Sequence, residues 1–488
     1  MTIRNLQNVI LSLTATIFLA LVFFKAYHAS FTHDESLTYN IYVGKTYWEI
    51  ISMVDPSANN HILNTLLMKV SEYLFGNREW ALRLPNVLGF LVFSIYTIRI
   101  FISSKRSWVG LLVISTLFFQ PFLNEMFAVG RGYGISYAMI LAGVFHLNTY
   151  LDQSDKYGQT KALIFFLLAT LASLNLIYLF VSVIMYINVL AFLSAKNGMS
   201  YFKTLLKINK NTFWVSTLLL IVLYEPFRLL IAEGQLYFGG SEGFLTDTIS
   251  SIAHVMLYEH YYFSHVIEFV YVMLGLGLGF IIWALFTLKK TRDFKEMVRT
   301  PLFSVAFIFM AIVAGSIANN WLFDTLFMLR RTAFFLYVLF IIMLFFAVDE
   351  LSSNTHLKSR LILYSLLVFS LSAAHFVLCY DSSKYLEWGG DASIKPMLTE
   401  LEHQAKSEGS TVKINLGVSW FFEPSINYYR KAYGYHTWLN KVTRDPFNAN
   451  QEYFFVIEEH KKDLPETETT LIQSYPKANT LLLKNTRN

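Results

Sequence analysis

Apolar runs of about 20 residues, separated by shorter polar stretches, repeat through the first three quarters of the chain. A helix needs about 20 apolar residues to cross a hydrocarbon layer about 30 Å thick. The pattern therefore predicts a polytopic α-helical membrane protein with about eleven transmembrane helices. The predicted spans cover residues 6–27, 84–102, 108–122, 134–151, two within 162–194, 213–232, one that ends at 289–290, 302–318, 332–348 and 361–379.

The composition supports this prediction. Of the 488 residues, 55% are hydrophobic and 15% are charged, whereas a soluble protein carries about 25% charged residues. The single cysteine, Cys379, excludes an intramolecular disulfide. The apolar run that starts at Val9 continues to Ala29 without a small-residue cleavage site, which favours a retained first helix over a cleaved signal peptide.

Lysine and arginine concentrate in alternate loops, and this asymmetry predicts the orientation of the chain. Loops rich in these cations stay on the cytoplasmic side of a membrane. We therefore expect a cytoplasmic N-terminus and an extracytoplasmic C-terminal domain, and we assign the basic clusters to topology and not to nucleic-acid binding. The cations that decide the orientation are Lys105, Arg106, Lys156, Lys161, Lys196, Lys203, Lys207, Lys210, the cluster from Lys289 to Arg299, Lys358 and Arg360.

The composition changes at Tyr380, where the long apolar runs end. The periodicity beyond this point predicts two helices and three short strands. The helices are residues 394–408 and 423–433, and the strands are residues 411–416, 453–457 and 481–483. We expect a transmembrane body (1–379) that includes a first outer loop (28–83), followed by a small extracytoplasmic α/β domain (380–488).

Two adjacent carboxylates, Asp34 and Glu35, open the first outer loop directly after the first span. Acidic oxygens at a membrane boundary could deprotonate an acceptor hydroxyl or amine, or help to bind a divalent cation. A structural alternative stays open. The pattern Thr32-x-x-Glu35 is a capping box, which would place Asp34 near the N-terminus of an interfacial helix.

Other polar residues lie in loops predicted on the same side of the membrane. His61 could contact a phosphate or a sugar, or it could be a helix-capping or hydrogen-bonded histidine. Glu125 and Arg131 flank the link between two spans, and they could face one cavity or pair with lipid headgroups. Arg330 and Arg331 stand at the start of a late span, where a guanidinium group could bind a phosphate or anchor the helix in the interface.

Several of these residues stand in segments that resemble motifs of the GT-C glycosyltransferases, in particular of the protein-mannosyltransferase and aminoarabinose-transferase branch. Residues 34–39 resemble its acidic motif D-E-x-x-x-Y, and residues 76–85 are similar to G-x-x-E-x-A-L-R-L-P. Residues 125–133 resemble the E-A-R-x-Y element, with a longer spacing between the acid and the arginine. Residues 60–63 stand where that branch often has His-Pro-Pro-Leu, but both prolines are absent. Residues 330–331 are similar to the arginine-containing start of a late helix.

The resemblance implies transfer of a sugar from a polyprenyl-phosphate donor to a lipid, glycan or protein acceptor, on the outer face of an inner (cytoplasmic) membrane. Asp34 would be the leading base, with Glu35 supporting it. The implied substrate-binding residues are Tyr39, His61, Glu125, Arg131, Arg330 and Arg331. Arg131 and one of Arg330 and Arg331 would face the donor phosphate, because a phosphate leaving group needs cationic stabilisation.

Two other functions stay open, a transporter or flippase of a lipid-linked sugar and a non-catalytic partner in envelope-polysaccharide assembly. A transporter predicts internal repeats and ionisable residues near the bilayer midplane, whereas this sequence shows no repeat and gathers most of its acids and bases at the outer boundary. The sequence has no Gly-rich phosphate loop, nucleophile elbow or paired-cysteine metal site. We therefore assign no cofactor, although a divalent cation could bind.

Overall fold

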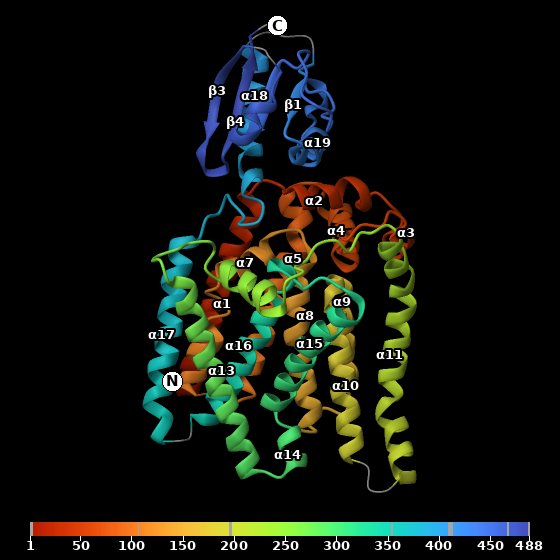
Figure 1. Cartoon of the computed structure of the whole chain (residues 1–488), viewed down its shortest axis with the longest axis vertical. Coiled ribbons are helices and arrows are strands. Elements are labelled where there is room, and N and C mark those ends of the chain that lie inside the picture. The colour runs from red at the N-terminus through yellow and green to blue at the C-terminus, as the bar shows by residue number, and fades with distance from the viewer. Residues whose placement is uncertain are drawn as a thin grey trace.

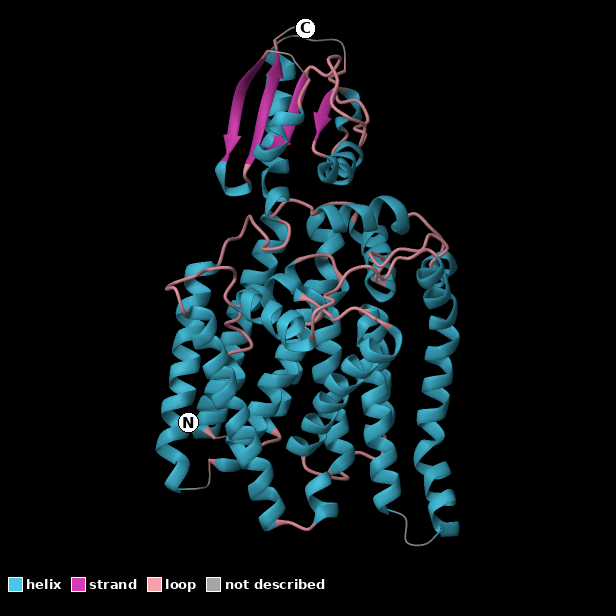
Figure 2. Ribbon diagram, viewed as in Figure 1, coloured by secondary structure: helices cyan, strands magenta, loops and turns pink. Residues whose placement is uncertain are grey.

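The fold consists of a bundle of long helices with a small sheet at one end. The computed structural model describes residues 3–105, 107–194, 198–352, 355–407, 413–465 and 468–486. Arg106, Lys196, Glu408, Thr411 and Val412, which entered the predictions above, lie outside these ranges. Figures 1 and 2 show the strands, together with α18 and α19, gathered at one end of the molecule, beyond the long helices of the bundle. We refer to this end of the bundle as the domain end.

The long helices follow the predicted spans and confirm a polytopic helical membrane protein. Seven of the described helices are long and apolar enough to cross a membrane, and the pair α7 and α8, bent by 110°, raises the number to eight. The remaining predicted spans correspond to the shorter helices α6, α9 and α16. The bundle helices are α1 (Ile3–His28), α5 (Glu79–Ile102), α6 (Trp108–Ser115), α8 (Gly132–Leu151), α9 (Gly158–Ala172), α10 (Ile177–Ser194), α11 (Gly198–Ala232), α13 (Val266–Thr291), α15 (Pro301–Phe323), α16 (Phe335–Leu351) and α17 (Thr355–Cys379).

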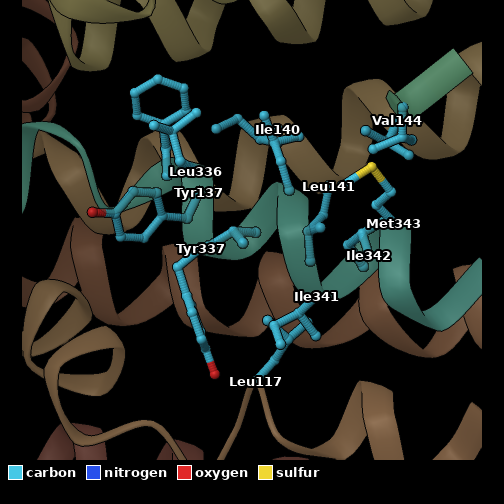
Figure 3. Packing of buried hydrophobic residues seen from close by; sticks show 14 of the residues in the cluster. Leu117, Tyr137, Ile140, Leu141, Val144, Leu336, Tyr337, Ile341, Ile342 and Met343 are labelled. Atoms are coloured by element: carbon cyan, nitrogen blue, oxygen red, sulfur yellow. The ribbon is translucent and has the colours of Figure 1, made fainter. Parts of the chain in front are cut away.

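Helix α16 belongs to the core of the bundle. Nearly all of its residues are buried, and a helix that is apolar on every side packs inside a protein. Figure 3 shows side chains of α8, including Tyr137 and Leu141, among those of α16, including Leu336 and Ile341. This packing fixes the start of α16 and, with it, the preceding 3-10 turn η4 (Arg330–Thr332).

Short helices connect the bundle helices. In the first loop they cover the domain end (Figure 1), and the capping residues Thr32 and Thr46 begin two of them. The segments of the first loop are α2 (His33–Leu37), the π-helical turn η1 (Thr38–Val43), α3 (Tyr47–Ser52) and α4 (Ile62–Phe75). The other short segments are α7 (Pro121–Ala128), η2 (Leu174–Leu176), η3 (Phe244–Ile249), α12 (Ser250–Met256) and α14 (Phe294–Val298).

Beyond α17 the chain forms a four-stranded mixed sheet with the order β1-β2-β4-β3. Strands β1 and β2 are parallel, and the connection between them carries a helix, as a parallel pair requires. Strand β4 pairs antiparallel with both β2 and β3. The elements are α18 (Ile394–Ser407), β1 (Leu416–Val418), α19 (Glu423–Ala432), β2 (Tyr453–Ile457), β3 (Thr469–Tyr475) and β4 (Thr480–Asn485).

The core of this C-terminal part continues into the first loop. Phe31, Met68 and Leu82 belong to the same buried apolar cluster as side chains of α18, α19 and the sheet. The ring centroids of Phe31 and Tyr428 lie 4.2 Å apart. The sheet and its helices therefore pack directly against the first loop, in addition to their covalent connection to the bundle.

The C-terminal part departs from the sequence prediction in two places. The predicted helices are confirmed as α18 and α19, but residues 413–415 of the strand predicted at 411–416 lie outside the regular strand. The regular strand β1 begins at Leu416, and Ile414 makes only an isolated bridge with Leu439. Strand β3 was not predicted, because its positions are mostly polar or exposed and give little apolar alternation.

Candidate active site

Helix α2 carries Asp34 and Glu35, and a capping box starts it. The Thr32 hydroxyl accepts a hydrogen bond from the Glu35 N–H at 3.3 Å, and Glu35 Oε2 accepts one from the Thr32 N–H at 2.9 Å. The structural alternative for Glu35 is therefore confirmed. Asp34 occupies the neighbouring position of the same turn and takes no part in the cap.

Glu35 lies in a fully buried ion pair with Arg83 of α5. Arg83 Nε donates to Oε1 and Arg83 Nη2 to Oε2, both at 2.7 Å, and both side chains are 0% exposed. The Gly130 N–H donates to Oε1 at 2.5 Å. Both carboxylate oxygens are thus occupied by protein groups, and Glu35 joins the first loop, α5 and the segment before α8.

Substitution of Glu35 by glutamine is expected to destabilise the fold by about 3–5 kcal/mol, because it leaves the Arg83 guanidinium buried without a counter-charge. Unfolding of the purified protein in detergent measures this change. The matched control is Glu402→Gln, which removes one partner of the Glu402–Lys406 pair on the surface of α18, outside the membrane spans, and should leave unfolding unchanged. Equal behaviour of the two variants would contradict the role assigned to Glu35.

The Asp34 carboxylate lies between two arginines from distant parts of the chain. Asp34 Oδ2 is 3.4 Å from Arg331 Nη2 and 3.7 Å from Arg131 Nη2, and the Asp34 side chain is 16% exposed. Among the described residues, none donates a hydrogen bond to Asp34 Oδ1. Burial raises the pKa of Asp34, but Arg131 and Arg331 together outweigh this effect and hold the pKa below its usual value of 3.8. The group is therefore a carboxylate at neutral pH.

Arg131 is held in the link between α7 and α8. Its Nη1 donates to the Asn59 carbonyl at 2.8 Å and to the Thr38 hydroxyl at 3.2 Å, and its side chain is 3% exposed. The glycines on either side permit this arrangement. A Cβ on Gly130 would lie 2.9 Å from Glu35 Oε1, and one on Gly132 would lie 1.8 Å from the Ala172 carbonyl oxygen.

Arg330 and Arg331 emerge from η4, at the domain end of the buried helix α16. Arg330 has φ of 48°, a left-handed conformation that costs a non-glycine residue about 1–3 kcal/mol and that is common at functional sites. Glu387 lies against both guanidinium groups. It accepts a hydrogen bond from Arg330 Nε at 3.0 Å and a short one from Arg331 Nη1. Arg330 also pairs with the half-exposed Glu259 at 2.9 Å, whereas Arg331 reaches Asp34.

His61 stands at the N-terminus of α4 with a fixed tautomer. Its Nδ1 lies 2.7 Å from the Ala172 carbonyl oxygen, and because a carbonyl only accepts, Nδ1 carries the proton and Nε2 is the acceptor. Burial and then Arg131 lower the pKa of His61 to about 3. His61 is therefore neutral above this pH and offers one acceptor nitrogen.

Three buried polar atoms around Asp34 have no hydrogen-bond partner within the part of the chain that the structure describes. They are Arg131 Nε, Arg331 Nε and His61 Nε2. Buried polar groups in folded proteins are nearly always paired, so each exception needs an explanation. Two unused donors on cations suit an anion, and one unused acceptor suits a hydroxyl or amine.

Two other predicted residues lie away from this group. The Tyr39 hydroxyl donates to Glu72 Oε1 at 2.7 Å, and burial followed by this hydrogen bond raises the pKa of Tyr39 to about 12. Glu125 pairs with Lys25 of α1 at 2.5 Å, so Glu125 and Arg131 do not face one cavity. No group of three or more histidine, cysteine, aspartate or glutamate side chains in the described residues could hold a metal ion.

Sequence reasoning did not assign a role to Arg83 or Glu387. Arg83 stands inside the segment 76–85 that resembles G-x-x-E-x-A-L-R-L-P, so a signal for it was present. Glu387 lies in an irregular stretch after α17, where no periodicity or motif marks it. Only the fold brings it to the arginines.

Comparison with solved structures identifies the architecture. ArnT from Cupriavidus metallidurans in the apo state superposes with a TM-score of 0.50 at 10% identity, over 97% of this chain and 97% of that chain. The archaeal oligosaccharyltransferase AglB from Archaeoglobus fulgidus, in complex with an inhibitory peptide and a dolichol-phosphate, superposes with a TM-score of 0.52 at 11% identity, over 94% of this chain and 70% of that chain. Both are GT-C glycosyltransferases. The chain has the GT-C fold.

At these identities the likeness concerns the fold, so the roles of individual residues are argued from their own geometry. No family model and no curated protein matches the sequence. The GT-C fold nevertheless agrees with the architecture expected from the sequence, a multi-pass helical membrane body followed by a small α/β part.

Proposed function

We propose that the protein is a glycosyltransferase that moves a sugar from a polyprenyl-phosphate donor to a hydroxyl or amine of a lipid, glycan or protein acceptor. The observation that carries the proposal is the ionised Asp34 carboxylate between Arg131 and Arg331, each of which has an unused buried N–H. A base next to two phosphate-binding cations is what this transfer needs. The GT-C fold supports the proposal, since AglB, which shares it, was solved with a dolichol-phosphate.

In the proposed reaction, the acceptor oxygen or nitrogen attacks the anomeric carbon of the donor sugar. Asp34 takes the proton of the acceptor as the new glycosidic bond forms. The bond between the anomeric carbon and the phosphate oxygen breaks, and its electron pair leaves with the polyprenyl phosphate. Arg131 and Arg331 stabilise the negative charge that develops on this phosphate, and His61 Nε2 accepts a hydrogen bond from the acceptor or from a sugar hydroxyl.

Glu35 and Glu387 enter the proposal as positioning residues, the first for the Asp34 turn and the second for the arginines. Arg330 adds positive charge beside Arg331. Tyr39 has no role at the reacting atoms in this scheme, because its hydroxyl is engaged with Glu72.

We also propose that the domain end faces the extracytoplasmic side of an inner membrane, with residues 1–379 as the catalytic body and residues 380–488 as an external domain. The charge pattern supports this orientation. Helix α14 and the basic cluster around it, from Lys289 to Arg299, lie at the opposite end of the bundle (Figure 1), where the positive-inside rule places the cytoplasm.

A transfer assay tests the proposed function. The purified protein is reconstituted in liposomes with polyprenyl-phosphate sugars that carry a labelled sugar, and envelope extracts supply the acceptor. The expected result is a labelled glycoside with release of polyprenyl phosphate. Movement of the intact labelled lipid across the vesicle membrane, without a new glycosidic bond, would instead identify a transporter of lipid-linked sugars.

The pH dependence of transfer is expected to show no inflection near pH 6.5, the ordinary pKa of histidine. His61, with a pKa of about 3, gains no proton in the neutral range, and the lowered pKa of Asp34 keeps its carboxylate ionised above pH 3.8. Activity that depends on Asp34 is therefore lost only as the pH falls below 3.8. Initial rates between about pH 5 and 8 measure this. An inflection near 6.5 that disappears in His61→Gln would contradict the assignment.

A further inference from the structure

A buried ion pair outside the Asp34 site connects to that site through the segment after α17. Lys25 Nζ of α1 and Glu125 Oε1 of α7 lie 2.5 Å apart, and the side chains are 4% and 2% exposed. A buried ion pair gains little stability over apolar side chains of the same size, because both charges lose their hydration. The contacts that the pair makes around it therefore indicate what it does.

These contacts go to the segment Asp381–Trp388, which is irregular over this length. Lys25 Nζ donates to the carbonyls of Asp381 and Lys384 at 2.7 and 2.6 Å. With Glu125 as the third partner, all three N–H donors of the ammonium group are used. Glu125 Oε2 accepts the N–H of Leu386 at 3.0 Å. The pair thus fixes the backbone of the segment at three points.

The next residue of the segment is Glu387, whose side chain is 3% exposed. Its carboxylate contacts Arg330 Nε at 3.0 Å and Arg331 Nη1. It offsets the repulsion between two neighbouring guanidinium groups and sets the plane of the Arg331 group. Arg331 in turn reaches Asp34 at 3.4 Å.

We propose that Lys25 and Glu125 are positioning residues that act through Glu387 to orient Arg331 toward the phosphate of the donor. The proposal rests on the proposed function, since it assigns the phosphate to Arg331. In this proposal Glu125 does not bind the substrate. It holds the segment Asp381–Trp388 that carries Glu387 to the arginines. A merely structural role would also explain the burial of the pair, so the test must separate the two.

The test is a double-mutant cycle on the dissociation constant for polyprenyl phosphate, measured with the full-length protein in detergent. Glu125→Gln removes the negative charge of the Lys25–Glu125 pair. It is expected to weaken the binding of polyprenyl phosphate about tenfold. In an Arg331→Gln background the same substitution should change binding by less than about twofold, because residues that act through one another are not additive. Glu402→Gln, at the Glu402–Lys406 surface pair of α18, is the matched control and should leave binding unchanged.

Tyr258→Phe is a second variant that disturbs the buried pair less, for use if Glu125→Gln does not fold. The Tyr258 hydroxyl donates to Glu125 Oε1, and its loss keeps the ion pair. Weakening of binding that vanishes in the Arg331→Gln background supports the proposal for either variant. The same factor of weakening in both backgrounds would overturn it and leave the proposed function intact. Absence of polyprenyl-phosphate binding by the wild type, or full binding by Arg331→Gln, would instead overturn the donor-phosphate assignment itself.

Discussion

Replacement of Asp34 by asparagine is expected to lower the rate of sugar transfer by at least about 100-fold, the usual scale for loss of a general base. Asparagine keeps the shape of the side chain but cannot take the proton of the acceptor. The loss should appear in the turnover of bound substrate and not in donor binding, because Arg131 and Arg331 remain and lose their competing carboxylate. Single-turnover transfer and polyprenyl-phosphate binding measure the two quantities separately.

The matched control for this variant is Asp155→Asn. Asp155 forms an exposed pair with Lys161 at 2.6 Å, in the link between α8 and α9 and away from the Asp34 site, so its loss should not change transfer. Unaltered turnover of Asp34→Asn would show that Asp34 is not the base. The transport of a lipid-linked sugar would then be the better account of the same cluster of charges.

Substitution of Arg331 by glutamine is expected to lower kcat/KM about 100- to 1000-fold, as is usual when one donor to a developing negative charge is removed. Arg331 contacts both Glu387 and Asp34. Its guanidinium carbon lies 5.2 Å from the ring centroid of Phe238 and 5.1 Å from that of Trp388. Arg331→Lys keeps the charge and loses the planar pair of donors, so a partial loss is expected.

Arg330→Gln is the matched control, because Arg330 shares the turn and the Glu387 contact but pairs with Glu259, whereas the arginines that pair with Asp34 are Arg131 and Arg331. Its effect on kcat/KM should be clearly smaller. Equal losses from Arg330→Gln and Arg331→Gln would show that the two arginines act as one general positive patch, and the specific assignment to Arg331 would be wrong.

The transmembrane body could be predicted from the sequence because lipid imposes a simple requirement on each span. A run of about 20 apolar residues is sufficient to indicate a helix, and the predicted spans match α1, α5, α8 and most of the other bundle helices. The pattern did not reveal that α16 is surrounded by other helices. An apolar residue that faces lipid and one that faces a neighbouring helix look the same in a sequence.

The candidate site was predictable in its residue types and less so in its contacts. Asp34, His61, Arg131 and Arg331 were all singled out, and the fold brings them together across about 300 positions of the chain. The resemblance ranked Asp34 above Glu35, and the capping-box pattern singled out Glu35. The buried ion pair of Glu35 was not foreseen, because it depends on Arg83, a residue of another helix. Polar contacts between distant segments carry no periodicity, so their partners appear only in three dimensions.

The packing of the C-terminal part against the first loop has a consequence for protein engineering. Lys395, Tyr429 and Tyr433, all from the C-terminal part, converge on the carboxylate of Glu79 at 2.6–2.9 Å. Truncation of the chain after Cys379 would remove all three of these partners of the Glu79 carboxylate, and it would expose the Phe31 ring to water. A chimaera that exchanges the C-terminal part with that of a related protein therefore needs to carry the first loop along, so that the two halves of this contact stay matched.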